Sequence, residues 1–277
     1  MYNNTGLIGH PLSHTLSPLI HNYCYFNSGI NGGYCCFDIP KEDLSWLISI
    51  FKKYSFKGFN VTLPYKSEII SLMDHLSEEV EQIGASNTVK IQDDKLYGYN
   101  TDIKGILATF NLFNVTLRDK KILVLGSGGS ARPLFYMLKN AGARSVDVVN
   151  RTVKNTENIL NELKIQKFNI YDTLFLKQRN MYDIIVNTTS LGLNSEDFFE
   201  MSNVGCSEFA FDLQYSVHGD TPFLSKYRGR CKCISDGLVM LISQGVEAFN
   251  IFHNMSFSWD VFDIRNKLIR QSGLEVN

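Results

Sequence analysis

The segment Ile122-Leu-Val-Leu-Gly126-Ser-Gly128-Gly129-Ser-Ala131-Arg132 decides the fold that we expect for this chain. Its branched apolar residues are flanked by lysines and stopped by glycines, which predicts a buried parallel strand that enters a tight turn. Apolar side chains return with helical spacing after the turn, so a helix should begin there. The free N–H groups and the positive dipole end of that helix would face an anion such as a pyrophosphate.

The glycine spacing of the same segment fits the fingerprint of dinucleotide-binding folds. In Gly126-x-Gly128-x-x-Ala131, the first glycine makes the turn, the second lets backbone approach phosphate, and the small third residue keeps helix and strand close. Glycine-rich turns of this kind also occur for packing reasons, so the fingerprint alone is weak evidence. Its strand–turn–helix context favours the nucleotide-binding interpretation.

Composition and charge narrow the class of protein. The chain has 277 residues, of which 44% are hydrophobic and 20% charged, as is ordinary for a globular protein of two domains. Its formal net charge of -1 leaves no basic excess with which to bind nucleic acid or an anionic membrane. No run approaches the roughly 18 apolar residues of a membrane span, and no basic leader precedes the first apolar segment. We therefore expect a cytoplasmic location, a small-molecule substrate, and neither a nucleic-acid nor a membrane partner.

The cysteines form no recognisable metal or disulfide pattern. No two of them make a C-x-x-C pair, and none stands at zinc-ligand spacing with histidine. We expect buried, reduced thiols and no metal site. The six residues are Cys24, Cys35, Cys36, Cys206, Cys231 and Cys233.

Alternating strand-like and helix-like segments predict an α/β protein of two domains. Strand, helix and strand patterns follow one another in the N-terminal third, and a hairpin turn falls at residues 92–95. Beyond the glycine segment, apolar strands alternate with helices and end in small polar residues, as in a doubly wound sheet. We expect an open α/β domain at residues 1–103, completed by helices within 237–277, and a Rossmann-like nucleotide-binding domain at 104–236.

Polar side chains gather where the N-terminal strands end. Asn60, Thr62 and Lys66 lie at or just beyond the end of one strand, and ligands of parallel sheets bind outside the carboxyl ends of strands. Asn87 and the run Asn100-Thr101-Asp102 lie in otherwise apolar strands, where they need hydrogen bonds to backbone or to a ligand. Taken alone, Lys66 is better explained as a solvated surface lysine.

The segment Thr15-Leu-Ser17-Pro18 predicts the start of a helix. Ser17 would be the N-cap and Pro18 the first helical residue. In a second interpretation, the hydroxyls of Thr15 and Ser17 join the free N–H groups of the helix in receiving a carboxylate. Spacing alone favours the capping interpretation.

The end of the second strand of the nucleotide-binding domain indicates NADP. An NAD site usually carries Asp or Glu there, roughly 20 residues after the glycine turn, to bind the ribose 2′-hydroxyl. Here the strand ends in Asn150-Arg151-Thr152, with Lys154 close behind, and Asp147 lies earlier, inside the strand. A cation and a hydroxyl suit a 2′-phosphate. An Arg151 that only packs over the adenine would also be compatible with NADP.

Short motifs are spread over nearly the whole chain. They are Ser13-x-Thr15-x-Ser17-Pro18, Asn60-Val-Thr62-x-Pro-x-Lys66, Ala85-Ser-Asn87-Thr88, Asn100-Thr-Asp102, Gly126-x-Gly-Gly-x-x-Arg132, Asn150-Arg-Thr152, Asn187-x-Thr-Ser190, Thr221-Pro-Phe-Leu and Asp236-Gly-Leu-x-Met-Leu-x-x-Gln244. Each is weak alone, but in this order they resemble the shikimate dehydrogenase family. The resemblance implies NADPH-dependent reduction of 3-dehydroshikimate to shikimate in aromatic amino-acid biosynthesis, by a two-domain protein that often forms a homodimer.

The resemblance also implies roles for individual residues. Lys66 and Asp102 would form the catalytic pair, in which the charged lysine polarises the ketone and donates a proton while the carboxylate orients it. Thr15 and Ser17 would hold the substrate carboxylate. The contacts to ring hydroxyls would come from Thr62, Asn87, Asp102, Tyr215 and Gln244. The cofactor contacts would come from Glu78, Gly126, Ser127, Gly128, Gly129, Ser130, Ala131, Asn150, Arg151, Thr152, Lys154, Thr189, Ser190, Leu213 and Gly237.

Three residues depart from the family pattern. Thr15 stands where many members have serine, and its extra methyl group narrows the carboxylate pocket, which bears on the preference between shikimate and the bulkier quinate. Ile103 and Val239 are β-branched where glycine is common. They put the loop geometry near the hydroxyl and nicotinamide contacts in question.

Two alternatives to an NADP-linked shikimate dehydrogenase stay open at this point. One is a quinate/shikimate dehydrogenase with NAD or dual cofactor use, which Arg151 disfavours. The other is a non-catalytic NADP-binding relative. The presence of both Lys66 and Asp102 disfavours the second alternative, because a binding module needs no proton donor.

Overall fold

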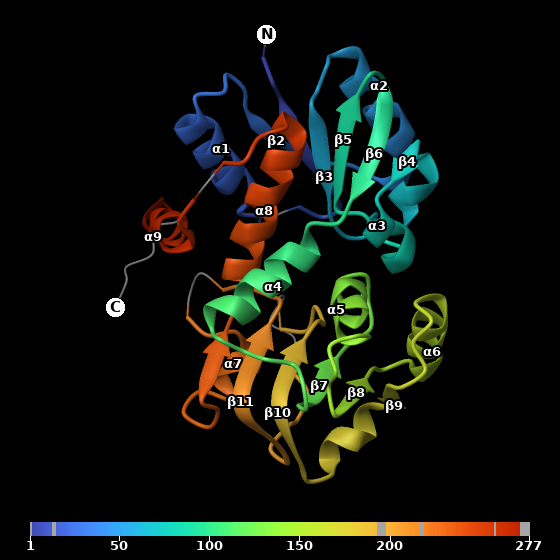
Figure 1. Cartoon of the computed structure of the whole chain (residues 1–277), viewed down its shortest axis with the longest axis vertical. Helices are drawn as coiled ribbons and strands as arrows, with labels where there is room; N and C mark the ends of the chain where they lie inside the picture. The colour runs from blue at the N-terminus through green and yellow to red at the C-terminus, as the bar shows by residue number, and fades with distance from the viewer. Residues whose placement is uncertain (1, 13–14, 193–197, 217–218, 258, 272–277) are drawn as a thin grey trace. The chain divides into compact units, whose positions relative to one another are not determined.

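The chain divides into two compact units, which are described separately (Figure 1). Unit 1 contains residues 1–105 and 241–277, and unit 2 contains residues 106–240. The computed structural model describes residues 2–12, 15–192, 198–216, 219–257 and 259–271. Ser13, the first residue of the serine and threonine motif, lies outside the described residues.

Unit 1 is built on a mixed sheet with the strand order β2-β1-β3-β5-β6-β4. Strands β1, β2 and β3 are parallel, β5 runs antiparallel to both β3 and β6, and β4 is parallel to β6. The expected hairpin is therefore present, as the β5–β6 pair. The strands are β1 (Thr5–Gly9), β2 (Tyr34–Asp38), β3 (Gly58–Val61), β4 (His75–Leu76), β5 (Thr88–Gln92) and β6 (Lys95–Tyr99).

The helices of unit 1 follow the apolar spacing of the sequence. In α2, the residues spaced i, i+3, i+4 and i+7 from Leu44 to Phe51 are buried, and the Phe51 ring lies 5.4 Å from that of Phe59 in β3. The helical segment that follows Lys66 is a 3₁₀ helix, η2. The helical elements are α1 (Ser17–Ser28), η1 (Lys41–Asp43), α2 (Leu44–Lys53), η2 (Glu68–Leu72), α3 (Glu78–Ile83) and α9 (Val261–Gln271).

Two longer helices each contain residues of both units. Helix α4 (Asp102–Leu112) begins in unit 1 and continues into unit 2. Helix α8 (Leu238–His253) begins in unit 2 and continues into unit 1. The two boundaries between the units, at residues 105/106 and 240/241, thus fall inside helices.

Unit 2 is a doubly wound sheet of parallel strands in the order β12-β11-β10-β7-β8-β9. The strands are β7 (Lys121–Leu125), β8 (Ser145–Val149), β9 (Asn169–Tyr171), β10 (Asn180–Asn187), β11 (Val204–Asp212) and β12 (Cys233–Ser235). The helical connections are α5 (Ala131–Leu138), α6 (Val153–Glu162), η3 (Thr173–Lys177) and α7 (Pro222–Ser225). This order has the reversal at β7 that is typical of Rossmann-like folds.

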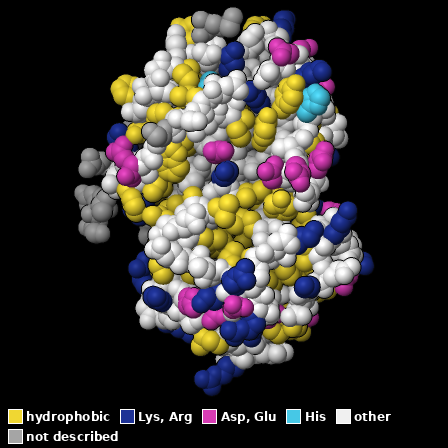
Figure 2. All heavy atoms as spheres, in the orientation of Figure 1, with side chains coloured by type: hydrophobic (Ala, Val, Ile, Leu, Met, Phe, Trp, Pro, Cys, Tyr) yellow, Lys and Arg dark blue, Asp and Glu magenta, His cyan; other side chains and the backbone are white. Residues whose placement is uncertain are grey.

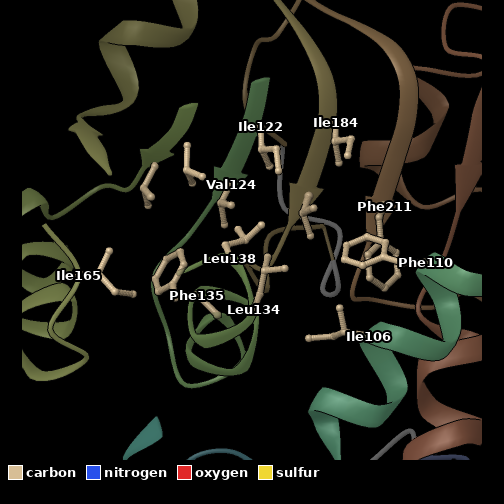
Figure 3. Packing of buried hydrophobic residues seen from close by; sticks show 14 of the residues in the cluster. Ile106, Phe110, Ile122, Val124, Leu134, Phe135, Leu138, Ile165, Ile184 and Phe211 are labelled. Atoms are coloured by element: carbon tan, nitrogen blue, oxygen red, sulfur yellow. The ribbon is translucent and has the colours of Figure 1, made fainter. Parts of the chain in front are cut away.

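The core of unit 2 holds the glycine turn between its strand and its helix. Figure 3 shows apolar side chains of β7 and β10 pointing toward Leu134 and Leu138 of α5, with Phe110 of α4 beside Phe211. The Phe110 and Phe211 rings meet edge to face with centroids 5.9 Å apart. Burial on both faces of the sheet explains why its strands are near-continuous apolar runs.

The expectation that the cysteines are buried is wrong for two of them. Cys35 and Cys36 are exposed, although Cys24 and Cys206 are buried. Strand β2 carries the exposed pair at the edge of the sheet of unit 1, and Tyr34 is the residue of this strand that is buried. Alternation along a strand buries one face only where another element covers that face.

The visible surface has mixed charge, with basic and acidic side chains interspersed (Figure 2). Among the described residues, no helix has the length and apolar character that crossing a membrane requires.

Loss of core volume in unit 2 should be costly. Ile184 in β10 is 0% exposed, whereas Leu174 in η3 is 61% exposed. We expect Ile184→Ala to lower the free energy of unfolding by about 2–5 kcal/mol, because the mutation loses transfer energy and leaves a cavity. Leu174→Ala, the matched control, should change it by less than about 0.5 kcal/mol. Urea denaturation followed by circular dichroism would measure both, and equal losses would contradict this packing.

Candidate functional site

Unit 1 contains a largely buried ion pair between Lys66 and Asp102. The Lys66 Nζ lies 2.7 Å from the Asp102 Oδ2, and the two side chains are 12% and 6% exposed. Lys66 follows β3 in a turn that Tyr65 anchors, because the buried Tyr65 hydroxyl donates to the carbonyl of Ile39 over 2.8 Å. Asp102 is the first residue of α4. The structure therefore brings together the two residues that were assigned to the catalytic pair.

Asn87 connects this ion pair to the hairpin. Its Nδ2 donates to the Asp102 Oδ1 over 2.9 Å, and its Oδ1 accepts from the backbone N–H of Thr101 over 2.8 Å. Asn87 is 3% exposed. Both carboxylate oxygens of Asp102 are thus hydrogen-bonded, Oδ1 to the Asn87 amide and Oδ2 to the Lys66 ammonium.

Gln244 joins the same network from α8. Its Oε1 accepts from the Asn87 Nδ2 over 3.2 Å and from the Thr101 hydroxyl over 3.3 Å. Its Nε2 donates to the carbonyl of Leu241, one turn back in the helix. Lys66, Asn87, Asp102 and Gln244 therefore lie in one hydrogen-bonded group within unit 1.

Some members of this group were not assigned roles from the sequence. Thr101 is 1% exposed and contacts both Asn87 and Gln244. Asn100 accepts from the backbone N–H of Asp102 over 3.1 Å, and its amide donates to the carbonyl of Ala85. The available signal was the presence of polar side chains in apolar strands, which indicates buried hydrogen bonds but not which group each side chain meets.

Thr15 and Ser17 lie together at the start of α1. The Thr15 Oγ1 donates to the Ser17 Oγ over 3.1 Å and accepts from the backbone N–H of Ser17 over 3.2 Å. The prediction that Ser17 caps the helix is wrong, because Leu16 is the N-cap residue and no side chain caps the helix there. The backbone N–H of Ser17 instead donates to the Thr15 hydroxyl. Two adjacent hydroxyls at a helix start can receive a carboxylate.

Thr62 closes the turn that carries Lys66. Its backbone N–H donates to the carbonyl of Ile8 in β1 over 2.9 Å, and its carbonyl accepts from the backbone N–H of Tyr65 over 2.9 Å. Nearby in β3, the Asn60 Nδ2 donates to the carbonyl of Asn87 over 3.1 Å. The backbone of Asn87 is therefore also held in place, and the turn that carries Lys66 is tied to β1.

In unit 2, the turn after β7 has the geometry of a phosphate-binding loop. Gly126 has a φ of 92°, and a Cβ there would lie 2.8 Å from the Thr189 Cγ2. A Cβ at Gly128 or Gly129 would meet nothing within 4 Å, so backbone at these positions is open to a ligand. Ala131 begins α5 and is 0% exposed, as the close approach of helix and strand requires.

A pocket of about 450 Å³ lies beside this turn. It is lined by Ser127, Gly128, Asn150, Arg151, Thr152, Asn155, Asn158 and Ile159. Asn155 and Asn158 were not predicted from the sequence, and both come from α6, which begins just after the Asn150-Arg151-Thr152 motif. The Ser127 hydroxyl accepts from the buried Thr156 hydroxyl over 2.9 Å, which holds the turn against the same helix.

The charges around this pocket favour a phosphate over a bare hydroxyl. Arg151 is exposed, and within the described part of the chain no carboxylate is paired with it. Lys154 forms an ion pair with Glu157 at 3.3 Å. Asp147 is buried, and its two oxygens accept from Tyr182 at 2.7 Å and from Asn169 at 2.8 Å. The Asp147 carboxylate is therefore hydrogen-bonded inside the sheet, and the Arg151 guanidinium is open to a ligand.

The ends of β10 and β11 are linked by a buried carboxylate. The Asp212 Oδ1 accepts from the Asn187 Nδ2 over 2.8 Å, and its Oδ2 accepts from the Thr221 hydroxyl over 2.6 Å. Burial raises the pKa of Asp212 to about 6, although these hydrogen bonds oppose the shift. Thr189 donates its hydroxyl to the Asn187 Oδ1 over 2.7 Å. These hydrogen bonds therefore hold the polar side chains at the ends of β10 and β11 in fixed positions.

Leu213 and Gly237 approach each other closely. A Cβ at Gly237 would lie 2.1 Å from the carbonyl oxygen of Leu213, so no larger residue fits there. The Gly237 N–H donates to the carbonyl of Gln214 over 2.8 Å. The Gln214 amide in turn donates to the carbonyls of Thr189 and Leu191. These contacts hold residues assigned to the cofactor on one rim of unit 2.

Four assigned residues lie outside these groups. Tyr215 follows β11 in unit 2, and it is half-buried. Ser190 is exposed after β10, and Ser130 is the N-cap residue of α5 without a capping side chain. Glu78 is the first residue of α3 in unit 1, where it accepts from Gln82 over 3.1 Å. Their roles remain predictions.

The two β-branched departures are compatible with the backbone. Ile103 is the second residue of α4, and Val239 is the second residue of α8. A helical backbone accepts β-branched residues at a small cost. The backbone at both positions is therefore helical and needs no glycine. Among the described residues, no group of three or more His, Cys, Asp or Glu side chains is arranged to hold a metal ion.

Comparisons with known proteins identify relatives of both units. Residues 7–89 match the family model described as shikimate dehydrogenase substrate binding domain, and residues 108–199 match that described as shikimate / quinate 5-dehydrogenase. The chain is 36% identical over 258 residues to a protein of Aquifex aeolicus named shikimate dehydrogenase (NADP(+)), with 92% of this chain and 93% of the relative covered.

Solved structures give the same result. Shikimate dehydrogenase 1 of Peptoclostridium difficile superposes with a TM-score of 0.86 at 30% identity, covering 97% of this chain and 98% of that one. Shikimate 5-dehydrogenase of Thermus thermophilus, solved in complex with NADP(H) and shikimate, gives a TM-score of 0.84 at 29% identity, covering 98% and 100%. This chain belongs to the shikimate dehydrogenase family.

Proposed function

We propose that this protein catalyses the reversible NADPH-dependent reduction of 3-dehydroshikimate to shikimate. The observation that carries the proposal is the largely buried Lys66–Asp102 ion pair, which lies among amide and hydroxyl groups that can bind a polyhydroxylated ring. Membership of the family and the name of the Aquifex relative support the same activity. Unit 1 would bind the substrate, and unit 2 would bind NADP.

The groups of unit 1 suit a hydroxylated cyclic acid. The paired hydroxyls of Thr15 and Ser17 would receive the substrate carboxylate. Asn87 and Gln244 can donate to and accept from ring hydroxyls, because amides present both kinds of group. Thr62 would add one more hydroxyl contact.

Lys66 is suited to supply the proton of the reaction. When bound, NADPH supplies a hydride to the ketone carbon, and negative charge then develops on the ketone oxygen. The Lys66 ammonium can polarise that oxygen and donate a proton to it as the alkoxide forms. Asp102 accepts from the Lys66 Nζ and holds it in place, and Asn87 restrains the other oxygen of Asp102. In the reverse direction, neutral Lys66 would take the proton from the alcohol.

The residues of unit 2 fit NADP. The open backbone at Gly128 and Gly129 would receive the pyrophosphate at the start of α5. Arg151 and Thr152 line the neighbouring pocket, where they would hold the 2′-phosphate. Thr189, Leu213 and Gly237 would lie along the rest of the cofactor.

A homodimer and a cytoplasmic location complete the proposal. Size-exclusion chromatography with light scattering tests the first, and fractionation of the source cells tests the second. The other proposed partners are the small-molecule substrate and NADP.

A cofactor and substrate matrix tests the activity directly. NADPH and NADH would be followed separately by absorbance with 3-dehydroshikimate and with 3-dehydroquinate. We expect turnover with NADPH and 3-dehydroshikimate. Turnover with none of the four pairs would reject the enzyme proposal and leave an NADP-binding relative. Preference for 3-dehydroquinate or for NADH would favour a quinate/shikimate dehydrogenase instead.

Loss of the Lys66 ammonium should remove most of the catalysis. We expect Lys66→Ala to lower kcat by about 10²–10⁴-fold, because the developing alkoxide loses its proton donor. Shikimate binding, measured by calorimetry, should persist. Lys41→Ala is the matched control, because Lys41 pairs with Glu68 on the surface of the same unit. An effect of Lys66→Ala on KM alone would remove Lys66 from acid–base catalysis.

Arg151 should select the phosphorylated cofactor. A charged hydrogen bond of about 1.5–3 kcal/mol corresponds to roughly 10–100-fold in affinity, so Arg151→Ala should raise the KM for NADPH by that factor. The KM for NADH should change little, because NADH has no 2′-phosphate. Arg179→Ala, at an exposed arginine of the same unit, should affect neither. Equal effects on the two cofactors would mean that Arg151 contacts another part of the nucleotide.

A further inference from the structure

Two cysteine side chains of unit 2 meet at the edge of its sheet. The Cys206 Sγ, in β11, lies 3.1 Å from the Cys231 Sγ, in the segment that leads into β12. The neighbouring backbone is paired, because Lys232 donates its N–H to the carbonyl of Ser207. The two thiols are therefore held together by strand pairing, although 25 positions separate them in sequence.

The two thiols differ in exposure and acidity. Cys206 is buried among apolar side chains that include Tyr227, whereas Cys231 is half-buried. The hydrogen bond between the sulfurs lowers the pKa of Cys231 and raises that of Cys206, which burial raises further. The Cys231 Sγ also contacts the carbonyl of Cys233 at 3.3 Å. Cys231 is thus the accessible and more nucleophilic thiol, and Cys206 is the sheltered thiol next to it.

We propose that Cys206 and Cys231 form a reversible dithiol/disulfide site whose co-substrate is a low-molecular-weight disulfide such as oxidised glutathione. The Cys231 thiolate attacks one sulfur of the small disulfide, forms a mixed disulfide and releases one small thiolate. The Cys206 sulfur then attacks the Cys231 sulfur, and its proton goes to the second small thiolate as that leaves. The chain loses two electrons and two protons overall, and the small disulfide becomes two thiols.

The geometry favours this pairing over other combinations of cysteines. Cys24, Cys35 and Cys36 belong to unit 1, whereas Cys206, Cys231 and Cys233 belong to unit 2. Strand pairing already brings the Cys206 and Cys231 sulfurs within hydrogen-bonding distance, whereas Cys233 meets Cys231 through its carbonyl.

The new bond would restrain functional parts of unit 2. The closed segment from Cys206 to Cys231 contains Asp212 and Thr221, whose hydrogen bond links the end of β11 to the start of α7. A cross-link that closes such a loop removes conformations from the unfolded chain and stabilises the fold. The oxidised protein should therefore unfold at a higher temperature than the reduced one. This inference does not depend on the proposed dehydrogenase activity.

The test uses the folded full-length chain in a background that removes the exposed thiols of β2. Cys35→Ser/Cys36→Ser protein would be incubated with excess oxidised glutathione, its remaining thiols alkylated, and its peptides identified by mass spectrometry without reduction. We expect loss of two titratable thiols and a Cys206–Cys231 linked peptide that dithiothreitol abolishes. The midpoint of thermal unfolding should rise by about 5 °C or more.

Single substitutions in that background separate the two thiols. Cys206→Ala should trap a glutathionyl adduct on Cys231, because the thiol that would resolve it is absent. Cys231→Ser should give neither link nor adduct on Cys206, and Cys233→Ser, the matched control, should keep the link.

Folded background protein that forms no link, or that links Cys231 to Cys233, would overturn the proposal. This measurement needs no change to Cys206, so it stands even where Cys206→Ala fails to fold. A link without a rise in the unfolding midpoint would overturn the stabilising effect.

Discussion

The site of unit 1 depends on the ion pair between Lys66 and Asp102. Removing two charges from water costs several kcal/mol for each ion, and their mutual attraction offsets this only where other hydrogen bonds satisfy the remaining polar atoms. Here the second oxygen of Asp102 accepts from Asn87, and the backbone N–H of Asp102 donates to Asn100. Burying the pair therefore costs free energy, and the surrounding hydrogen bonds fix its position. That combination suits a group that must keep its orientation while it transfers a proton.

The orientation of the Asn87 amide follows from its backbone partner. A backbone N–H can only donate, and that of Thr101 lies 2.8 Å from one atom of the amide, so this atom must be the oxygen Oδ1. The nitrogen Nδ2 must then face Asp102 and Gln244, and the Gln244 atom that it meets must be an oxygen. One backbone contact thus fixes the polarity of the network. A ring hydroxyl near Gln244 would meet an acceptor that is already partly used, which restricts the orientations that a substrate can take.

Much of the fold and of the site was predictable, because both follow local rules. The strand, the Gly126 turn and the helix are set by apolar runs and glycine spacing, and the structure has them where the pattern places them. The predictions failed where distant segments decide the outcome. Cys35 is exposed because its strand lies at a sheet edge. The prediction for Ser17 failed for a local reason instead, because Leu16 is the N-cap residue and the Thr15 hydroxyl accepts from the Ser17 N–H. The contact between Thr101 and Gln244 joins residues 143 positions apart, which no local spacing indicates.

Two charged residues near the end of β8, Asp147 and Arg151, lie in different surroundings. Alternation along the strand turns Asp147 inward, where it accepts from Tyr182 and Asn169, and the strand ends before Arg151. Moving Asp147 to a ribose would leave the Tyr182 hydroxyl buried without a partner, a loss of about 1–3 kcal/mol. An acid for a ribose hydroxyl must therefore come from the positions after Val149, where Asn150 and Arg151 stand. The carboxylate of β8 thus serves the sheet, and a cation stands just after the strand, an arrangement that supports the proposed role of Arg151 in binding the 2′-phosphate.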